Sequence, residues 1–100
     1  EIKGIAHCVS PDGSLLATAL LGQVVMSDAG SGITLYELEV GMPVINLRFS
    51  PTQYWIAIAT VGALQVFDLV SRAKLRNIVT NKALSWSSDG LYVAGFSVLT

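Results

Sequence analysis

Charged residues and cysteines are both scarce in this 100-residue chain. Charged residues make up 13% of it and hydrophobic residues 52%, whereas roughly 25% of an average globular protein is charged. A single cysteine, Cys8, excludes an internal disulfide and a cysteine-based zinc site. The formal net charge of −1 argues against a uniformly basic protein that coats nucleic acid. So little charge indicates that most residues contact other protein atoms rather than water.

Long apolar runs and helical periodicity are missing too. The longest apolar stretch, residues 15–22, is interrupted by Thr18 and is followed by Gln23, so it falls short of the roughly 18 residues of a membrane helix. We therefore expect no membrane span. The chain begins Glu-Ile-Lys and lacks a charged-then-apolar signal segment. We expect it to be part of a longer protein.

What the chain does contain is an internal repeat of forty residues. A shift of 40 positions superposes identical residues at many places: Ile5 on Ile45, Ser10-Pro11 on Ser50-Pro51, Ala17 on Ala57, Ala19 on Ala59, Gly22 on Gly62, Asp28 on Asp68, Ser31 on Ser71 and Leu35 on Leu75. A third copy begins 37 residues after the second and superposes Ser87 on Ser50 and Ala94 on Ala57. Agreement at so many positions indicates repeated structural units.

Each copy reads as short strands separated by turns. Ser-Pro-Asp-Gly at residues 10–13 has the signature of a type I turn, and Ser-Ser-Asp-Gly at 87–90 repeats it without proline. Alternating apolar residues between such turns predict strands. The predicted strands are 4–9, 14–20, 23–28, 33–39, 43–49, 54–60, 63–68, 74–79, 82–86 and 91–97.

Four short strands in about 40 residues are typical of a blade of a WD40-type β-propeller. We therefore predict an all-β fold of about two and a half four-stranded antiparallel blades. The repeat divides the chain into residues 1–30 (part of a blade), 31–70 (a complete blade) and 71–100 (an incomplete blade). The Trp-Asp pair typical of this pattern is reduced to Ser27-Asp28 and Phe67-Asp68, so the aspartate persists without the tryptophan.

One stretch carries a more specific resemblance. INLRFSPTQYWIAIATVGALQVFDL, residues 45–69, resembles the sixth blade of the receptor for activated C kinase, a family of seven-bladed WD40 scaffolds. Its most specific element is Ser-Pro-x-x-Tyr-Trp at 50–55. VSPDGSLLATA at 9–19 and GQVVMSD at 22–28 resemble the preceding blade, and LSWSSDGLYVAGF at 84–96 resembles the last one.

The resemblance implies a function without catalysis. Members of the family are scaffolds on the head of the small (40S) ribosomal subunit, where they contact ribosomal RNA and ribosomal proteins. They recruit protein kinase C and other signalling proteins and influence translation in the cytoplasm. Their main ribosome-docking residues lie on the first blade, which matches no part of this chain. The alternative is another WD40 adaptor, such as a G-protein β-like or ubiquitin-ligase subunit, without ribosome association.

Groups able to catalyse a reaction are few. His7, the one histidine, aligns with Leu47 and Leu84, so we expect it to be packed in the core. Cys8 points to the opposite face of the strand, and the two therefore cannot form a dyad. Asp12 occupies a turn position where aspartate bonds its own backbone. We expect no enzyme, cofactor, metal site or small-molecule substrate.

Basic residues are concentrated in one segment. Arg72, Lys74, Arg76 and Lys82 lie within residues 72–82, which contain no acid. The first three alternate along one predicted outer strand and are expected to point to one side. They either keep a solvated edge from aggregating or contact phosphates of ribosomal RNA or an acidic protein.

The aromatic pair Tyr54-Trp55 divides between two roles. Trp55 aligns with Leu15 and Tyr92, so we expect it in the packing between blades. Tyr54 aligns with Ser14 and Leu91 and is free to vary, which makes it a candidate for partner contact or modification. A base-stacking platform would need several aromatic residues on one face with basic residues between them, and that pattern is missing.

Overall fold

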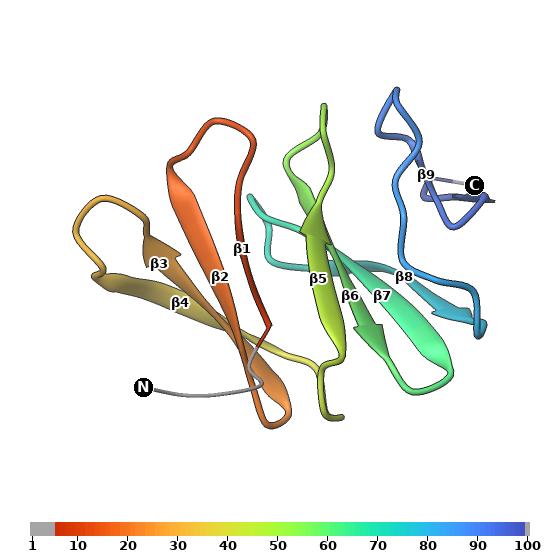
Figure 1. Ribbon diagram of the computed structural model, residues 1–100, viewed down its shortest axis with the longest axis horizontal. Coiled ribbons are helices and arrows are strands. Elements are labelled where there is room, and N and C mark those ends of the chain that lie inside the picture. Colours follow the sequence, from red (N-terminus) through yellow and green to blue (C-terminus); the bar gives the residue numbers. More distant parts are fainter. Residues whose placement is uncertain (1–5, 100) are drawn as a thin grey trace.

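Two four-stranded antiparallel sheets and a small hairpin form the structure, a computed structural model that describes residues 6–99 (Figure 1). Sheet 1 contains β1 (His7–Val9), β2 (Leu15–Leu20), β3 (Gln23–Asp28) and β4 (Thr34–Glu39). Sheet 2 contains β5 (Asn46–Phe49), β6 (Trp55–Thr60), β7 (Ala63–Asp68) and β8 (Lys74–Val79). The hairpin pairs β9 (Tyr92–Val93) with β10 (Phe96–Ser97). The prediction of an all-β fold with four-stranded antiparallel blades is confirmed.

Hydrogen bonds within the repeated turns explain why serine and aspartate recur there. In the first turn, the Gly13 amide donates to the Ser10 carbonyl over 2.9 Å, and the Ser10 hydroxyl donates to Asp12 Oδ1 over 2.7 Å. The Ser14 amide donates to the same oxygen. These bonds hold the pKa of the Asp12 carboxyl at about 2, the Ser10 hydroxyl having the largest effect. The 87–90 turn has the same bonding, with the Gly90 amide donating to the Ser87 carbonyl.

Asp28 and Asp68, the aspartates retained without the tryptophan, stabilise the turn between the third and fourth strands of each sheet. The Ser31 amide donates to Asp28 Oδ2 over 2.7 Å, and the Val70 amide donates to Asp68 Oδ1 over 2.8 Å. An aspartate side chain that bonds amides two or three residues ahead stabilises a turn by itself. The turn therefore forms in both sheets although neither copy has the tryptophan.

The sheets pack face to face around two hydrophobic clusters, one on each side of sheet 2. The first cluster joins sheet 1 to sheet 2, and Met26, Leu47 and Ile56 are fully buried in it. The second joins sheet 2 to residues 84–98 and includes Trp55 and Val93. Burying one large apolar side chain stabilises a fold by about 1.5–3 kcal/mol. Sheet 2, apolar on both faces, is thus the central layer of the described structure.

The third copy departs from the predicted strands. Residues 82–86 form no strand, and only Trp86 makes an isolated bridge, to Val93. The predicted strand 91–97 is split because Ala94 and Gly95 both have positive φ, 50° and 84°. Two consecutive residues with positive φ form the tight turn of a two-residue hairpin. Glycine at 95, where the second copy has Ile58, permits this reversal.

The four-stranded sheets run over residues 7–39 and 46–79. Their limits therefore differ from the division at residues 30 and 70 that the repeat suggested. A period of forty residues fixes the spacing of the units but not the strand with which a sheet begins. The predicted first strand, 4–9, is observed as β1 from His7; residues 4 and 5 lie outside the described part of the chain.

Candidate interaction surfaces

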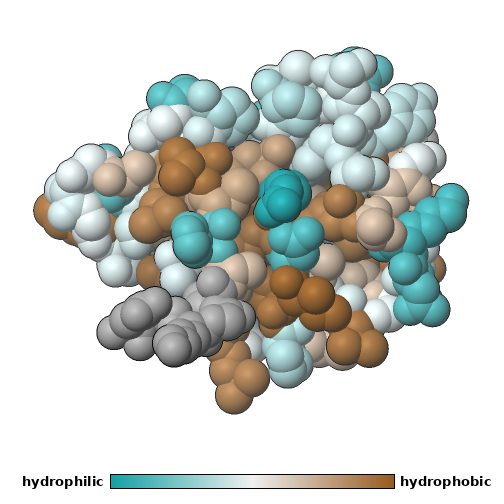
Figure 2. Space-filling view, in the orientation of Figure 1, coloured by the Kyte–Doolittle hydropathy of each residue, from teal (hydrophilic) through white to brown (hydrophobic). Residues whose placement is uncertain are grey.

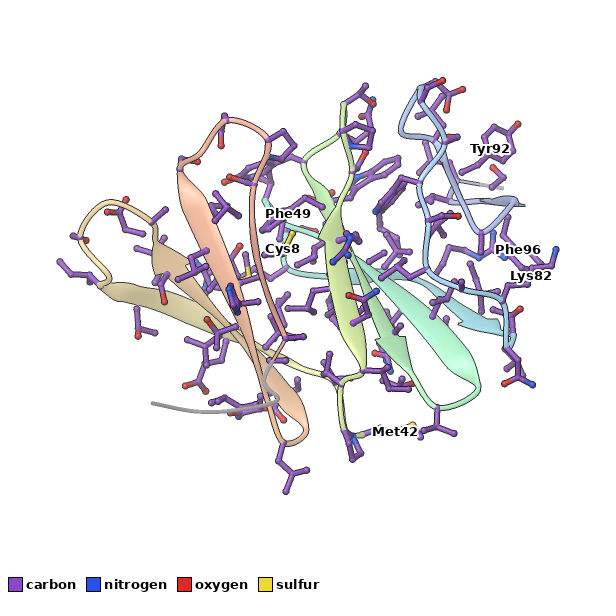
Figure 3. The ribbon with its side chains drawn as sticks, in the orientation of Figure 1. Cys8, Met42, Phe49, Lys82, Tyr92 and Phe96 are labelled. Atoms are coloured by element: carbon purple, nitrogen blue, oxygen red, sulfur yellow. The ribbon has the colours of Figure 1, made fainter. Side chains whose placement is uncertain are left out.

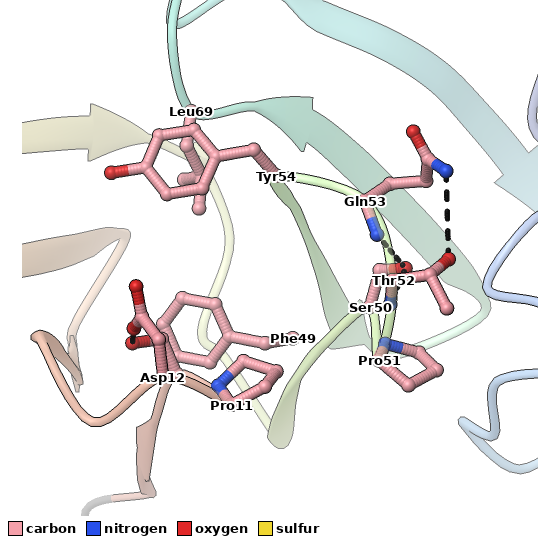
Figure 4. Close-up of a pocket in the computed structure, with 10 residues that line it drawn as sticks. Pro11, Asp12, Phe49, Ser50, Pro51, Thr52, Gln53, Tyr54 and Leu69 are labelled. Atoms are coloured by element: carbon pink, nitrogen blue, oxygen red, sulfur yellow. Dashed lines mark hydrogen bonds between the residues drawn. The ribbon is translucent and has the colours of Figure 1, made fainter.

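A hollow of about 200 Å³ opens where sheet 1 meets sheet 2, beside the two Ser-Pro turns (Figure 4). We call it the seam hollow, and its lining residues are Ser10, Pro11, Asp12, Phe49, Ser50, Pro51, Thr52, Gln53, Tyr54 and Leu69. Phe49 and Leu69 belong to the core. Tyr54, by contrast, is 48% exposed. The sequence prediction that Tyr54 varies and reaches the surface agrees with this position, while its contact with a partner stays a prediction.

Tyr36 and Arg72 lie next to this hollow, and the sequence pattern did not point to Tyr36. The Arg72 guanidinium lies 4.0 Å from the centre of the Tyr36 ring. The Tyr36 hydroxyl donates to the Leu69 carbonyl over 3.3 Å. Burial, with a smaller effect of Tyr54, raises the pKa of the Tyr36 phenol, against which Arg72 acts in the opposite direction. Strand β4 and the turn between β7 and β8 thus contribute to one aromatic and cationic cluster at the junction of the sheets.

The basic residues do not form one patch, so the prediction that Arg72, Lys74 and Arg76 point to one side is wrong. A β-bulge shifts the register between β7 and β8, so that Lys74 pairs with Phe67 and Arg76 with Val66. Adjacent residues of a strand face opposite ways, and the side chains of Lys74 and Arg76 accordingly lie on opposite faces of sheet 2. Sequence alternation could not show this because one extra residue reverses it.

Contacts of the basic side chains divide them into two pairs. Arg72 and Lys74 lie toward sheet 1, the latter with Nζ 5.8 Å from the centre of the Phe67 ring. Arg76 Nη1 donates to the Ser97 carbonyl over 2.5 Å. Lys82 Nζ lies 5.2 Å from the centre of the Phe96 ring (Figure 3). Each pair therefore flanks a different junction between structural units.

Trp55 occupies the predicted position in the packing between units. It is 7% exposed, and its ring centre is 6.3 Å from that of Trp86. Trp86 Nε1 donates to the Arg48 carbonyl over 3.0 Å, which attaches residues 84–98 to β5. The first-copy counterpart of Trp55, Leu15, is buried at the junction of sheets 1 and 2, whereas the third-copy counterpart, Tyr92, is exposed.

The expectation of a core-packed His7 is wrong. His7 is exposed, and so is Val9 on the same face. Their counterparts Leu47 and Phe49 are buried because they pack against sheet 1. Within the described residues, no further sheet covers the corresponding face of sheet 1. Cys8 points the other way and packs partly buried against the core, as the strand alternation predicted.

No group of three or more histidine, cysteine, aspartate or glutamate side chains among residues 6–99 is arranged to hold a metal ion. In the same range, no helix is long and apolar enough to cross a membrane.

Comparisons with known proteins agree with the sequence pattern and the sheet architecture. No family model matches the chain. Small ribosomal subunit protein RACK1 of Candida albicans is 36% identical over 102 residues, which cover 87% of this chain and 32% of that protein. The Brassica napus protein of that name is 38% identical over 82% of this chain and 26% of its own length. This chain is RACK1-like.

The likeness extends to a protein with a different name and to a solved structure. Cross-pathway control WD-repeat protein 2 of Flammulina velutipes is 36% identical over 89% of this chain and 33% of its own length. Kuenenia stuttgartiensis hydrazine synthase matches in structure with a TM-score of 0.76 and 25% identity, over 86% of this chain and 27% of that one. The RACK1-like chain spans about a third of the length of the curated relatives it matches. Its sheets are WD-repeat blades of a β-propeller.

Proposed function

We propose that this chain belongs to a non-enzymatic WD40 scaffold that associates with the small ribosomal subunit in the cytoplasm. The observation that carries the proposal is the similarity of 82–89% of the chain to small ribosomal subunit proteins named RACK1 and to a WD-repeat control protein. A scaffold needs surfaces that hold partners rather than a catalytic centre. The described residues fit this need, since their accessible chemistry lies at sheet junctions and turns.

The finer part of the proposal concerns partners. On this view the protein recruits protein kinase C and other signalling proteins and influences translation. The two basic pairs, Arg72–Lys74 and Arg76–Lys82, would contact phosphates of ribosomal RNA or acids of a ribosomal protein. Contacts of this kind position a protein without reading sequence, and they weaken as salt rises. Tyr54 is proposed as a contact for a protein partner at the seam hollow.

Sedimentation of the full-length protein through sucrose gradients tests ribosome association. We expect the protein in the small-subunit and polysome fractions at low salt and partial release at high salt. Recovery wholly in the light fractions at low salt would refute ribosome association. It would then favour a WD40 adaptor of the G-protein β-like or ubiquitin-ligase type.

Charge reversal separates the two basic pairs. The double variants R72E/K74E and R76E/K82E change net charge equally but at different junctions. If one pair contacts RNA phosphates, its reversal lowers the salt concentration needed for release, and the other double variant serves as the control. Equal sedimentation of both variants and the unmodified protein at every salt concentration would exclude an RNA contact by either pair.

A further inference from the structure

The two ends of the sheets differ in chemistry. Antiparallel order places the 10–14, 50–53 and 87–90 turns at one end, here called the polar end. Residues 20–23, 41–45, 60–63 and 79–84 lie at the opposite end, here called the apolar end. In these turns the polar end exposes serine, threonine, glutamine and aspartate, while Ile33 and Val70 are exposed in the neighbouring turns after β3 and β7. The apolar end exposes large hydrophobic side chains, namely Leu21, Met42, Ile45, Val61 and Val79.

Figures 2 and 3 show this asymmetry directly. Hydrophobic surface gathers along the lower part of the molecule, where the apolar end lies, and Met42 is labelled there. Leu21 is 86% exposed and Val61 is 72% exposed. Both stand at the tip of a turn rather than on the face of a sheet. Further sheets stacked on either side would therefore leave these side chains in solvent, and an exposed group of this kind marks an interaction site.

A groove of about 390 Å³ adjoins these residues at the junction of sheet 2 with residues 80–84. Its apolar wall includes Ile45, Val61 and Leu84. Its polar wall includes Asn46, Asn81 and Lys82. No lining residue is acidic, and Lys82 carries the one charge. The groove therefore combines an apolar wall with an uncompensated positive charge.

Three hydrogen-bond donor groups in this groove have no partner in the described part of the chain. Asn46 Oδ1 accepts from the Leu47 amide and from Arg48 Nη1, which directs the amide NH₂ group elsewhere. In the described part of the chain, that NH₂ group, the Asn81 side chain and Lys82 Nζ make no hydrogen bond or ion pair. Lys82 Nζ has instead its contact with the Phe96 ring. Two amide donors and an ammonium group are complementary to a carboxylate.

We propose that this groove docks an extended segment of a partner protein in which an acidic side chain stands next to an apolar one. The carboxylate meets Lys82, Asn81 and Asn46, while the apolar neighbour packs against Ile45, Val61 and Leu84. The inference rests on the proposed scaffold function, though not on ribosome association. It favours a protein segment over RNA, because the apolar wall offers neither a second cation nor an aromatic ring for stacking.

Fluorescence anisotropy with the full-length protein tests the proposal. The first probe is an array of labelled short peptides that place Glu or Asp one to three positions from Leu or Val. The matched probe has Lys in place of each acid, and a labelled oligouridine represents RNA. We expect the acidic peptides to bind with a Kd in the range of about 10–100 μM. The lysine peptides and the oligouridine are expected to bind at least about tenfold more weakly.

Variants locate the binding. K82E is expected to weaken binding of the acidic peptides by at least about tenfold, and V61S is expected to weaken it by several-fold. K74E makes the same charge change at the other junction and is the control, with an expected effect within about twofold. N81D adds a negative charge to the groove without changing the lysine; it is expected to weaken binding of the acidic peptides as well and serves in case K82E does not fold. Matching thermal unfolding curves establish that each variant is folded.

Several results would overturn the docking proposal. These are no binding by any acidic peptide, equal weakening by K74E and K82E, equal binding of lysine peptides, or tighter binding of oligouridine that K82E abolishes. The last result would make the groove a nucleic-acid site. Peptide binding by a protein that stays in the light gradient fractions would refute ribosome association and leave the docking site standing.

Discussion

Replacing Gly90 by alanine probes the contact between the second and third copies of the repeat. The Ser50 hydroxyl donates to the Gly90 carbonyl over 3.0 Å, and the Thr52 hydroxyl donates to the Asp89 carbonyl over 2.6 Å. A Cβ atom on residue 90 would lie 2.1 Å from Thr52 Oγ1 and 2.6 Å from Ser50 Oγ. Both separations are far below contact distance. The Ser50 and Thr52 hydroxyls must therefore rotate away or the two turns must move apart, and either change breaks these bonds.

The magnitude follows from three costs. Alanine at a φ of +74° costs about 1–2 kcal/mol. Two hydrogen bonds contribute about 1 kcal/mol each. The Ser50 oxygen still accepts from the Thr52 and Gln53 amides, and leaving its buried proton without an acceptor adds about 1 kcal/mol. We expect G90A to lower the free energy of unfolding by about 3–5 kcal/mol, a large part of the roughly 5–15 kcal/mol of a typical domain.

Gly13 provides a matched control for this substitution. It holds the same place in its own turn, its φ is +78°, and a Cβ there meets nothing within 4 Å. G13A is therefore expected to cost only the backbone term, about 1–2 kcal/mol. Urea unfolding followed by tryptophan fluorescence measures both, because Trp55 and Trp86 lie in the same cluster on sheet 2. Equal destabilisation by G90A and G13A would refute the steric argument, as would additive effects of G90A and T52A in the double variant.

Substitutions at three further positions test other parts of the structure. The pKa of Asp12 is about 2, below its ordinary value of 3.8. The ionised carboxylate therefore contributes fully to stability above pH 3.8, and this contribution is lost as the pH falls toward 2. In a plot of unfolding free energy against pH, D12N should show a smaller decrease over this range than the unmodified protein. Arg72 has a φ of 65° and stacks on Tyr36. R72A and R72G both lose the ring contact, but only R72A keeps the backbone strain. The free energy of unfolding in urea should therefore be about 1 kcal/mol higher for R72G than for R72A. Gln65 is 3% exposed; its Nε2 donates to the Val40 carbonyl over 3.3 Å, while its Oε1 has no partner within residues 6–99. In Q65M the gain from removing the unpaired oxygen offsets the loss of the bond to Val40, so the free energy of unfolding should change by no more than about 1 kcal/mol; a loss above about 2 kcal/mol in the same assay would contradict this.

The fold was predictable because repetition, turn chemistry and strand alternation agree. Strands 23–28, 63–68 and 74–79 were predicted at their observed bounds, since turn residues enclose each of them. The persistence of Asp28 and Asp68 without tryptophan was visible in the sequence, and the structure supplies the reason in their bonds to the turn amides. Core positions such as Trp55 were predictable from their apolar character in every copy.

The surface was harder to predict because one inserted residue, or the presence of a neighbouring sheet, decides which side chains are exposed. The bulge in β8 sends Lys74 and Arg76 to opposite faces, although their spacing alone places them together. His7 repeats the position of Leu47 but not its environment, because burial depends on the sheet that packs against it. Tyr36 and Arg72 meet only through the packing of two sheets, and no local pattern encodes such a contact.

Differences between the copies, rather than their agreement, point to the surfaces that bind partners. The connection that leaves sheet 1 carries Gly41-Met42, and the equivalent connection after sheet 2 carries Asn81-Lys82. The backbone bond to the preceding turn is kept, from Val40 to Gly22 in one case and from Thr80 to Gly62 in the other. The connection therefore retains its place while its side chains change from apolar to cationic. A substitution that leaves the shared hydrogen bond intact but adds charge beside an apolar wall alters recognition without altering the fold. K82E is therefore expected to weaken docking by at least about tenfold and to lower the free energy of unfolding by no more than about 1 kcal/mol, the contribution of the Lys82–Phe96 contact.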